Sequence, residues 1–333
     1  MQNKTIRWAA AIAFLLAFLV VMLGAYTRLT NAGLGCPDWP GCYGHMVLPS
    51  AGAGLQEAQT LYPQAPIVAT KAWTEMIHRY AAGSLALLIF FIGLSVIRKR
   101  CQGDQLPWHI PVALLILVLF QAALGMWTVT LKLLPIVVMG HLLGGMVLVA
   151  CLSRFCLQMS PLLGQDLPQW RPWLRLAVFV VFFQIALGGW VSSNYAGISC
   201  IGFPRCNGVW LPDLYFAKGF NLFSTVGANY QGGLLDNNVR ITIQFIHRVG
   251  AVLTALYILS LAVLMASKTN FRPLKTAAKL MALLVLVQFT LGIANVVYFL
   301  PLKAAVAHNG VAALLLATVF STLHFTRGRQ AYV

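Results

Sequence analysis

The chain has 333 residues, of which 59% are hydrophobic and 9% are charged, and its mean hydropathy is +0.79. Soluble domains carry about 25% charged residues, so this composition excludes an ordinary soluble protein and indicates an integral membrane protein. The formal net charge of +16 does not indicate a nucleic-acid partner, because the basic residues lie mostly at the ends of apolar runs. Basic residues in those places orient a protein in the lipid membrane.

The first apolar run, residues 6–29, follows basic residues as the core of a signal peptide does. It is too long for such a core, and no convincing small-residue cleavage site follows it. We therefore interpret it as a retained transmembrane helix.

Eight runs are long and apolar enough to cross about 30 Å of hydrocarbon. We expect these spanning helices at residues 7–29, 74–98, 108–130, 135–158, 172–194, 240–266, 274–299 and 302–326. Two long connections, 30–73 and 195–239, are rich in Gly, Pro, Asn and aromatic residues, which is typical of ordered loops at a membrane surface. The distribution of Lys and Arg predicts that both termini are cytoplasmic and that both long connections lie on the outer face.

The first four helices resemble the last four at nearly constant offsets. Cys36 and Cys42 recur 164 positions later as Cys200 and Cys206. The residues that recur at an offset of 167 are Gln121, Gly125 and His141, matched by Gln288, Gly292 and His308. This pattern predicts an all-α membrane protein built as two duplicated four-helix bundles, related by a pseudo-two-fold axis along the membrane normal. The N-terminal half is expected at residues 1–165 and the C-terminal half at 166–333.

Four histidines are placed near the outer ends of the even-numbered helices: His78, His141, His247 and His308. Each half thus has two imidazoles at one depth, and two imidazoles can ligate a heme from its two faces. A bare metal ion, which needs three or four ligands, and a proton relay without a cofactor are the alternatives. Two heme sites, one per half, explain the duplication best.

One motif differs between the halves. Glu75 precedes His78 by three positions in the first half, whereas Gln244 takes that place before His247 in the second. Positions i and i+3 share a helix face, and a carboxylate can shuttle protons where an amide can only hydrogen-bond. We therefore predict that the first half is the reacting half, with Glu75 as its catalytic residue, although an acid merely resting at the interface is the simpler alternative.

Three arginines near the outer surface are candidates for binding heme propionates, because a guanidinium matches a carboxylate. Arg79 and Arg248 directly follow His78 and His247, and Arg28 ends the first helix. Snorkelling of these side chains to the membrane interface is the alternative.

The cysteine pairs Cys36–Cys42 and Cys200–Cys206 lie in the outer connections, where disulfides can form. Structural disulfides are the favoured interpretation, and thiol–disulfide exchange with a redox partner is the other. Metal binding is disfavoured, because the loops supply few further ligands.

Together these motifs resemble the heme A synthases of bacterial membranes and the mitochondrial inner membrane, over essentially the whole chain. The resemblance implies a bacterial cytoplasmic membrane enzyme that oxidises the C8 methyl group of heme O to a formyl group, giving heme A for terminal oxidases. It implies that His247 and His308 hold a heme b cofactor, that His78 and His141 bind the substrate heme O, and that Glu75 is essential for turnover.

The expected partners are heme O, the enzyme that produces it and an electron donor or acceptor that the sequence does not identify. A homo-oligomer is left open. The alternatives are a di-heme electron-transfer protein and a heme carrier, neither of which modifies heme. Electron transfer alone does not need a carboxylate at only one of two hemes, and this difference favours the synthase.

Overall fold

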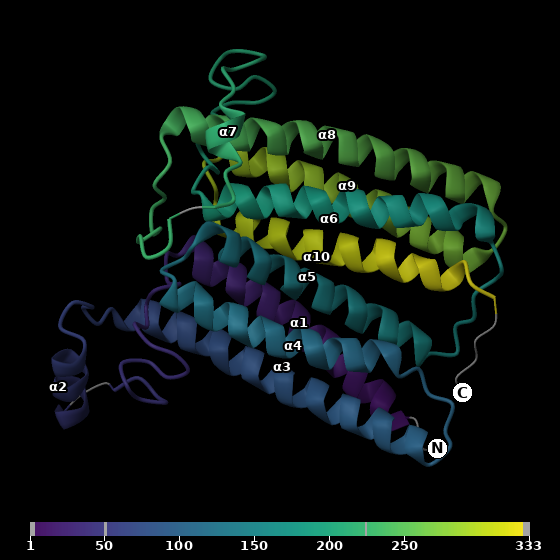
Figure 1. Cartoon of the computed structure of the whole chain (residues 1–333). Coiled ribbons are helices and arrows are strands. Elements are labelled where there is room, and N and C mark those ends of the chain that lie inside the picture. The colour runs from purple at the N-terminus through teal and green to yellow at the C-terminus, as the bar shows by residue number, and fades with distance from the viewer. Residues whose placement is uncertain (1–3, 50–51, 224, 329–333) are drawn as a thin grey trace.

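The structure, a computed structural model, describes residues 4–49, 52–223 and 225–328. Within these ranges all regular secondary structure is helical, apart from two isolated β-bridges, Cys42–His45 and Cys206–Val209. Eight of the described helices are long and apolar enough to span a membrane, which confirms the predicted fold class (Figure 1). They are α1 (Lys4–Leu29), α3 (Ala69–Cys101), α4 (His109–Thr130), α5 (Pro135–Gln158), α6 (Arg171–Ser193), α8 (Asn237–Lys268), α9 (Arg272–Val297) and α10 (Leu302–Phe325).

The predicted helix ends agree best with the observed ends at the short turns, and they differ most for α3 and α8. Each of these two helices continues beyond its predicted apolar run at both ends. Polar residues in water can continue a helix, so hydropathy marks the part in lipid rather than the whole helix. The long connections also contain short helices that the sequence did not predict: α2 (Gly52–Leu61) and α7 (Phe216–Gly219). A 3₁₀ turn, η1 (Pro168–Trp170), precedes α6.

The spanning helices form two groups of four that lie side by side (Figure 1). In the first group, α1 and α4 each pack against α3 and α5, and in the second, α6 and α9 each pack against α8 and α10. The groups meet where α5 packs against α6 and α10, and where α1 packs against α10. The grouping agrees with the expected halves, 1–165 and 166–333, and the duplication itself remains an interpretation.

Small residues allow the helices to approach closely. Ala10, Ala13 and Ala17 follow one face of α1 and are almost completely buried. Between the halves, the hydroxyl groups of Ser153 on α5 and Ser321 on α10 lie 2.9 Å apart. Small side chains and hydrogen bonds between helices are what hold membrane helices together, because lipid provides no hydrophobic drive for their association.

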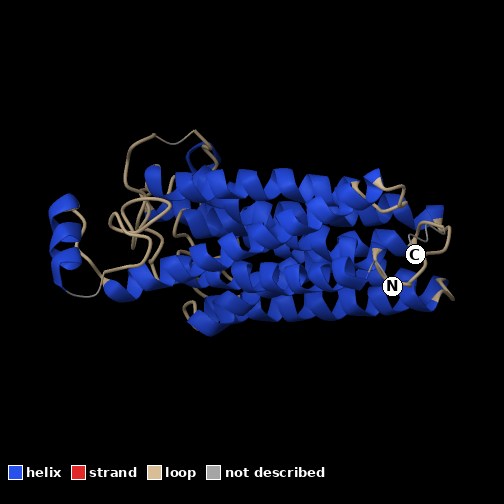
Figure 2. Ribbon diagram, turned by 90° about the horizontal axis from the view of Figure 1, so that it is seen from below, coloured by secondary structure: helices blue, strands red, loops and turns tan. Residues whose placement is uncertain are grey.

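The start of α1 and the end of α10 lie at one end of the bundle, and the two long connections with α2 and α7 lie at the other (Figures 1 and 2). The helices run nearly parallel between these ends, so the two long connections share one surface (Figure 2). This arrangement agrees with the predicted topology, in which the termini and the long connections are on opposite sides of the membrane.

Candidate heme-binding site

The first pair of histidines is brought together within the N-terminal group. His78 on α3 and His141 on α5 are half-buried, their ring centroids are 6.4 Å apart, and their ring planes are at 89°. Bonds between a metal and an imidazole nitrogen are about 2 Å long, so an iron ligated from opposite sides needs ring centroids roughly 6 Å apart. The distance between the two rings therefore suits one metal centre with two axial imidazoles.

The second pair lies in the matching place of the C-terminal group. His247 on α8 and His308 on α10 are half-buried and close enough to interact electrostatically. Both rings meet a glutamine: Nε2 of Gln184 is 3.0 Å from Nδ1 of His247, and Nε2 of Gln288 is 3.2 Å from Nε2 of His308.

Each histidine ring packs against a glycine of a neighbouring helix. A Cβ atom on Gly24 would lie 3.1 Å from Cε1 of His78, and one on Gly188 would lie 3.0 Å from Cε1 of His247. The equivalent distances are 3.4 Å from Gly125 to His141 and 3.2 Å from Gly292 to His308. The absence of a side chain at these four positions therefore decides where the rings can lie.

Two of these glycines, Gly24 and Gly188, are functional candidates that the sequence reasoning missed, as is Gln184. The signal that could have found the glycines is the cysteine-pair offset, because they too are 164 positions apart. Two further glycines, close to the paired histidines in sequence, have other neighbours. A Cβ on Gly144 would overlap the amide of Gln121, and one on Gly310 would lie 2.3 Å from the sulfur of Met22.

Glu75 is buried, with 4% of its surface exposed, and its carboxylate is fully engaged. Oε1 pairs with Arg79 at 2.5 Å, and Oε2 accepts a hydrogen bond of 3.0 Å from the backbone N–H of Cys36. The acid therefore joins the histidine-bearing helix α3 to the loop that contains the Cys36–Cys42 disulfide.

Arg79 also binds this loop. Besides Glu75, its guanidinium donates to the carbonyl oxygens of Asp38, Pro40 and Gly41. The loop is also tied internally, because the carboxylate of Asp38 accepts the backbone N–H groups of Tyr43 and Gly44.

Tyr43 packs with the two cysteines of this loop and is almost completely buried. Burial first, and then the negative charges of Glu75 and Asp38, raise the pKa of Tyr43. Its phenol therefore stays protonated and donates to the carbonyl of Pro66 at 3.1 Å.

The second loop repeats part of this arrangement. Cys200 and Cys206 form a disulfide, and Arg248 donates to the carbonyl oxygens of Cys200, Gly202 and Arg205. Gln244 differs from Glu75, because its Oε1 is buried without a partner among the described residues.

The three arginines expected at heme propionates are thus placed against protein groups. Arg79 and Arg248 bind the disulfide loops, and Arg28 donates to the carbonyl of Ser192 at 2.5 Å and lies 3.9 Å from the ring centre of Tyr195. Arg28 therefore connects α1 of the first half to the end of α6 in the second. Propionate binding by these side chains remains a prediction.

The described residues contain no cluster of three or more His, Cys, Asp or Glu side chains placed to hold a bare metal ion. His45 and His109 lie outside both histidine pairs, and His324 contacts the carbonyl of Leu162. The described part of the chain therefore offers paired imidazoles, which suit a heme, rather than a ligand set for a bare metal.

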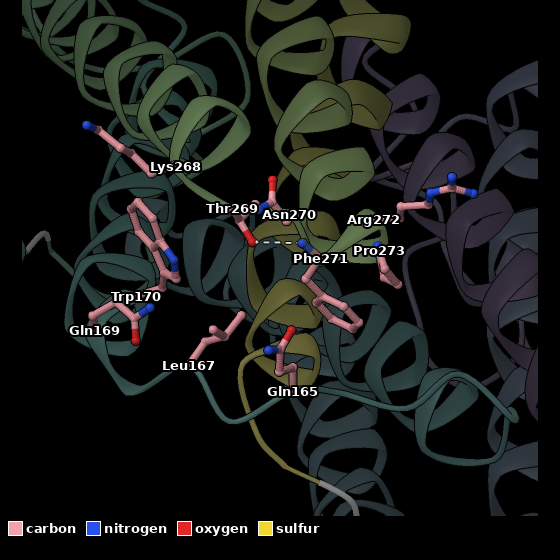
Figure 3. A pocket seen from close by; sticks show the side chains of 10 residues that line it. All are labelled: Gln165, Leu167, Gln169, Trp170, Lys268, Thr269, Asn270, Phe271, Arg272 and Pro273. Atoms are coloured by element: carbon pink, nitrogen blue, oxygen red, sulfur yellow. Dashed lines mark hydrogen bonds between the residues drawn. The ribbon is translucent and has the colours of Figure 1, made fainter.

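A cavity of about 630 Å³ lies at the opposite end of the bundle, between the start of α6 and the turn from α8 to α9 (Figure 3). Trp170 and Phe271 are among its lining residues, and the side chains of Lys268 and Arg272 point away from each other (Figure 3). Since none of the four paired histidines lines it, this cavity is separate from the histidine sites.

The profile of the cytochrome oxidase assembly protein family, COX15-CtaA, matches residues 7–320. The chain belongs to this family. It is 44% identical over 322 residues to the heme A synthase of Shewanella oneidensis, covering 96% of both chains. It is also 30% identical over 363 residues to the heme A synthase of Allorhizobium ampelinum, covering 99% of this chain and 92% of the relative. The heme A synthase of Granulibacter bethesdensis is 27% identical over 347 residues.

The residues at both histidine pairs fit heme. Nδ1 of His78, His141 and His308 is buried without a hydrogen-bond partner among the described residues, and each ring has a glycine at its edge. Buried polar atoms are normally paired, so unpaired imidazole nitrogens indicate groups that act on something other than the protein itself. The family and the geometry therefore indicate the same ligand class.

Proposed function

We propose that this chain is a heme A synthase, which oxidises the C8 methyl group of heme O to a formyl group. The observation that carries the proposal is the N-terminal site, where the His78 ring lies 6.4 Å from the His141 ring and His78 follows the buried Glu75 by one helical turn. The similarity to curated heme A synthases along nearly the whole chain supports it.

In this proposal His78 and His141 bind the heme O substrate and orient it within the N-terminal half. The methyl carbon is oxidised first to an alcohol and then to a hydrated aldehyde that loses water. With water as the oxygen source, each oxidation releases two electrons, which go to the external electron partner, and two protons, which Glu75 takes up in turn. Arg79 and the backbone N–H of Cys36 hold the two carboxylate oxygens, so the acid has a fixed position relative to His78. General acid–base catalysis of this kind contributes about 10²–10⁴-fold to a rate.

We propose that His247 and His308 hold a heme b cofactor in the C-terminal half. When bound, this group supplies one-electron transfer between the reacting half and an external electron partner. The protein's own part is to fix both rings, through Gln184, Gln288 and the glycines Gly188 and Gly292.

We further propose that the protein lies in the bacterial cytoplasmic membrane with both termini in the cytoplasm. The disulfide loops are then on the outer, oxidising side, where such bonds persist. The enzyme that produces heme O and an electron donor or acceptor are the expected partners.

A di-heme electron-transfer protein would use the same four histidines. The difference between Glu75 and Gln244 favours the synthase, because Glu75 is ion-paired and tied to its loop whereas Oε1 of Gln244 has no partner among the described residues.

The test is co-expression of the full chain with a heme O source in a host that makes no heme A, followed by extraction and chromatography of the hemes. We expect heme A in the membranes that contain the chain. Extracts that contain only heme O and heme B would exclude the synthase.

Replacing His247 by Ala should abolish the low-spin heme b spectrum of the purified protein, and its retention would contradict the assignment of the C-terminal site.

A further inference from the structure

The two halves differ in how their α3 and α8 histidines are held. In the C-terminal half, Nε2 of Gln184 contacts Nδ1 of His247 at 3.0 Å and donates to the His247 carbonyl at 2.9 Å. The residue 164 positions before Gln184 is Val20 on α1, which can contact His78 through its backbone but has no side-chain amide. Nδ1 of His78 is accordingly buried without a partner among the described residues.

A second difference accompanies the first. A Cβ atom on Gly250 of α8 would lie 2.3 Å from Oε1 of Gln184, so this glycine makes room for the amide. The residue 169 positions earlier, at the offset that relates His247 to His78, is Ala81. The C-terminal half therefore has both the amide and the space for it, and the N-terminal half has neither.

The amide of Gln184 suits a ligating imidazole. A histidine that binds a metal through one nitrogen usually donates its other N–H to a nearby acceptor, which fixes the ring and strengthens the ligand. Gln184 carries a donor and an acceptor on one carbon, and its Oε1 is buried without a partner among the described residues. Half a turn about the last side-chain bond presents this oxygen to an imidazole N–H, and the bond from Nε2 to the His247 carbonyl is then given up.

We propose that Gln184, packed against Gly250, is a positioning residue that makes the C-terminal heme permanent, and that Val20 and Ala81 leave His78 without a side-chain amide, so that the N-terminal half can take up and release heme. The inference rests on the proposed function for the identity of the two hemes. It assigns the difference between cofactor and substrate sites to two pairs of matching positions outside the ligands: Val20 with Gln184, and Ala81 with Gly250. A substrate site must release its product, and a less constrained ligand allows this.

The test uses the full chain, purified with its hemes, and the variant Gln184→Leu. Removing such hydrogen-bond partners of metal ligands typically costs about 10–100-fold in metal affinity. We therefore expect transfer of heme b from the variant to excess apomyoglobin to be about 10–100-fold faster than from the wild type. The matched variant Phe183→Leu, at the exposed chain neighbour of Gln184 on α6, should leave this rate unchanged. An unchanged rate in Gln184→Leu would overturn the proposal.

The midpoint potential of the C-terminal heme separates positioning from general stability. A hydrogen bond from imidazole N–H to an acceptor makes the ligand more basic and favours the ferric state. The Gln184→Leu variant should therefore have a higher midpoint potential than the wild type. Faster heme release at an unchanged potential would show that Gln184 acts only by packing, and would overturn the proposal.

A transplant keeps the inference testable if Gln184→Leu does not fold. The double variant Val20→Gln, Ala81→Gly gives the N-terminal half the amide and its space, and we expect heme in that half to be released at least about tenfold more slowly. Release at the wild-type rate would count against the proposal. These readouts do not require heme A, so a chain that binds both hemes but makes no heme A would refute the proposed function alone.

Discussion

At the scale of the residue, the glycines beside the four paired histidines decide where the imidazole rings can lie as much as the larger side chains do. Gly24 and Gly188 allow His78 and His247 to approach the neighbouring helix, at distances where a methyl group would already press on the ring. The pattern of four histidines was predictable from their spacing. The glycines and Gln184 were not singled out, because a small or amide residue in an apolar run is ordinary until a packing partner is known.

Replacing Gly188 by Ala tests this control of ring position. The new methyl group would lie 3.0 Å from Cε1 of His247, and overpacking of this kind costs about 1–3 kcal/mol. We expect heme b affinity to fall by roughly tenfold or more, measured by titration of the low-spin absorption band. The control is Gly83→Ala, where an added Cβ has nothing within 4 Å. Equal affinities in the two variants would contradict this account of the ring.

At the scale of the element, each disulfide loop is fastened to the helix that carries a histidine. Arg79 and Arg248 bind loop carbonyls from α3 and α8, but only the first loop also reaches the acid of its helix, through the N–H of Cys36 and the carboxylate of Glu75. The sequence predicted the pairing of the cysteines. It could not predict these contacts, because the loop and the acid are 39 positions apart and their approach depends on the folded loop.

Removing the two disulfides separately should have unequal effects. The double variant Cys36→Ser, Cys42→Ser loosens the loop that positions Glu75, and small displacements of catalytic groups cost about tenfold or more in rate. We expect heme A formation to fall about tenfold in heme O-producing cells that express this variant, measured by chromatography of the extracted heme. The matched variant Cys200→Ser, Cys206→Ser should retain more activity. A larger loss in the second variant would show that the first loop does not serve Glu75.

At the scale of the whole molecule, two similar groups of four helices share one interface and place both long connections on one surface (Figure 1). The number of helices and their grouping followed from hydropathy and from the repeated motifs, since these features are local in sequence. The extensions of α3 and α8 and the helix α2 did not, because they lie in polar segments whose structure depends on tertiary contacts.

The orientation of this bundle can be measured with thiol labelling. Cys101, at the end of α3, is free and exposed, whereas the four cysteines of the two long connections are bonded in pairs. We predict that a membrane-impermeant maleimide labels Cys101 only after the cells are permeabilised. In a Cys101→Ser background, a cysteine replacing the exposed Gln59 of α2 should be labelled in intact cells. The reverse pattern would invert the topology.

The central claim is that the halves have different tasks, and that Glu75 makes the first half the reacting one. The most direct measurement is the heme composition of membranes from a heme O-producing host that expresses either Glu75→Ala or Gln244→Ala. We predict that both variants bind heme, that Gln244→Ala still yields heme A, and that Glu75→Ala accumulates heme O with heme A lowered by about 100-fold or more. Equal amounts of heme A from the two variants would contradict the claim.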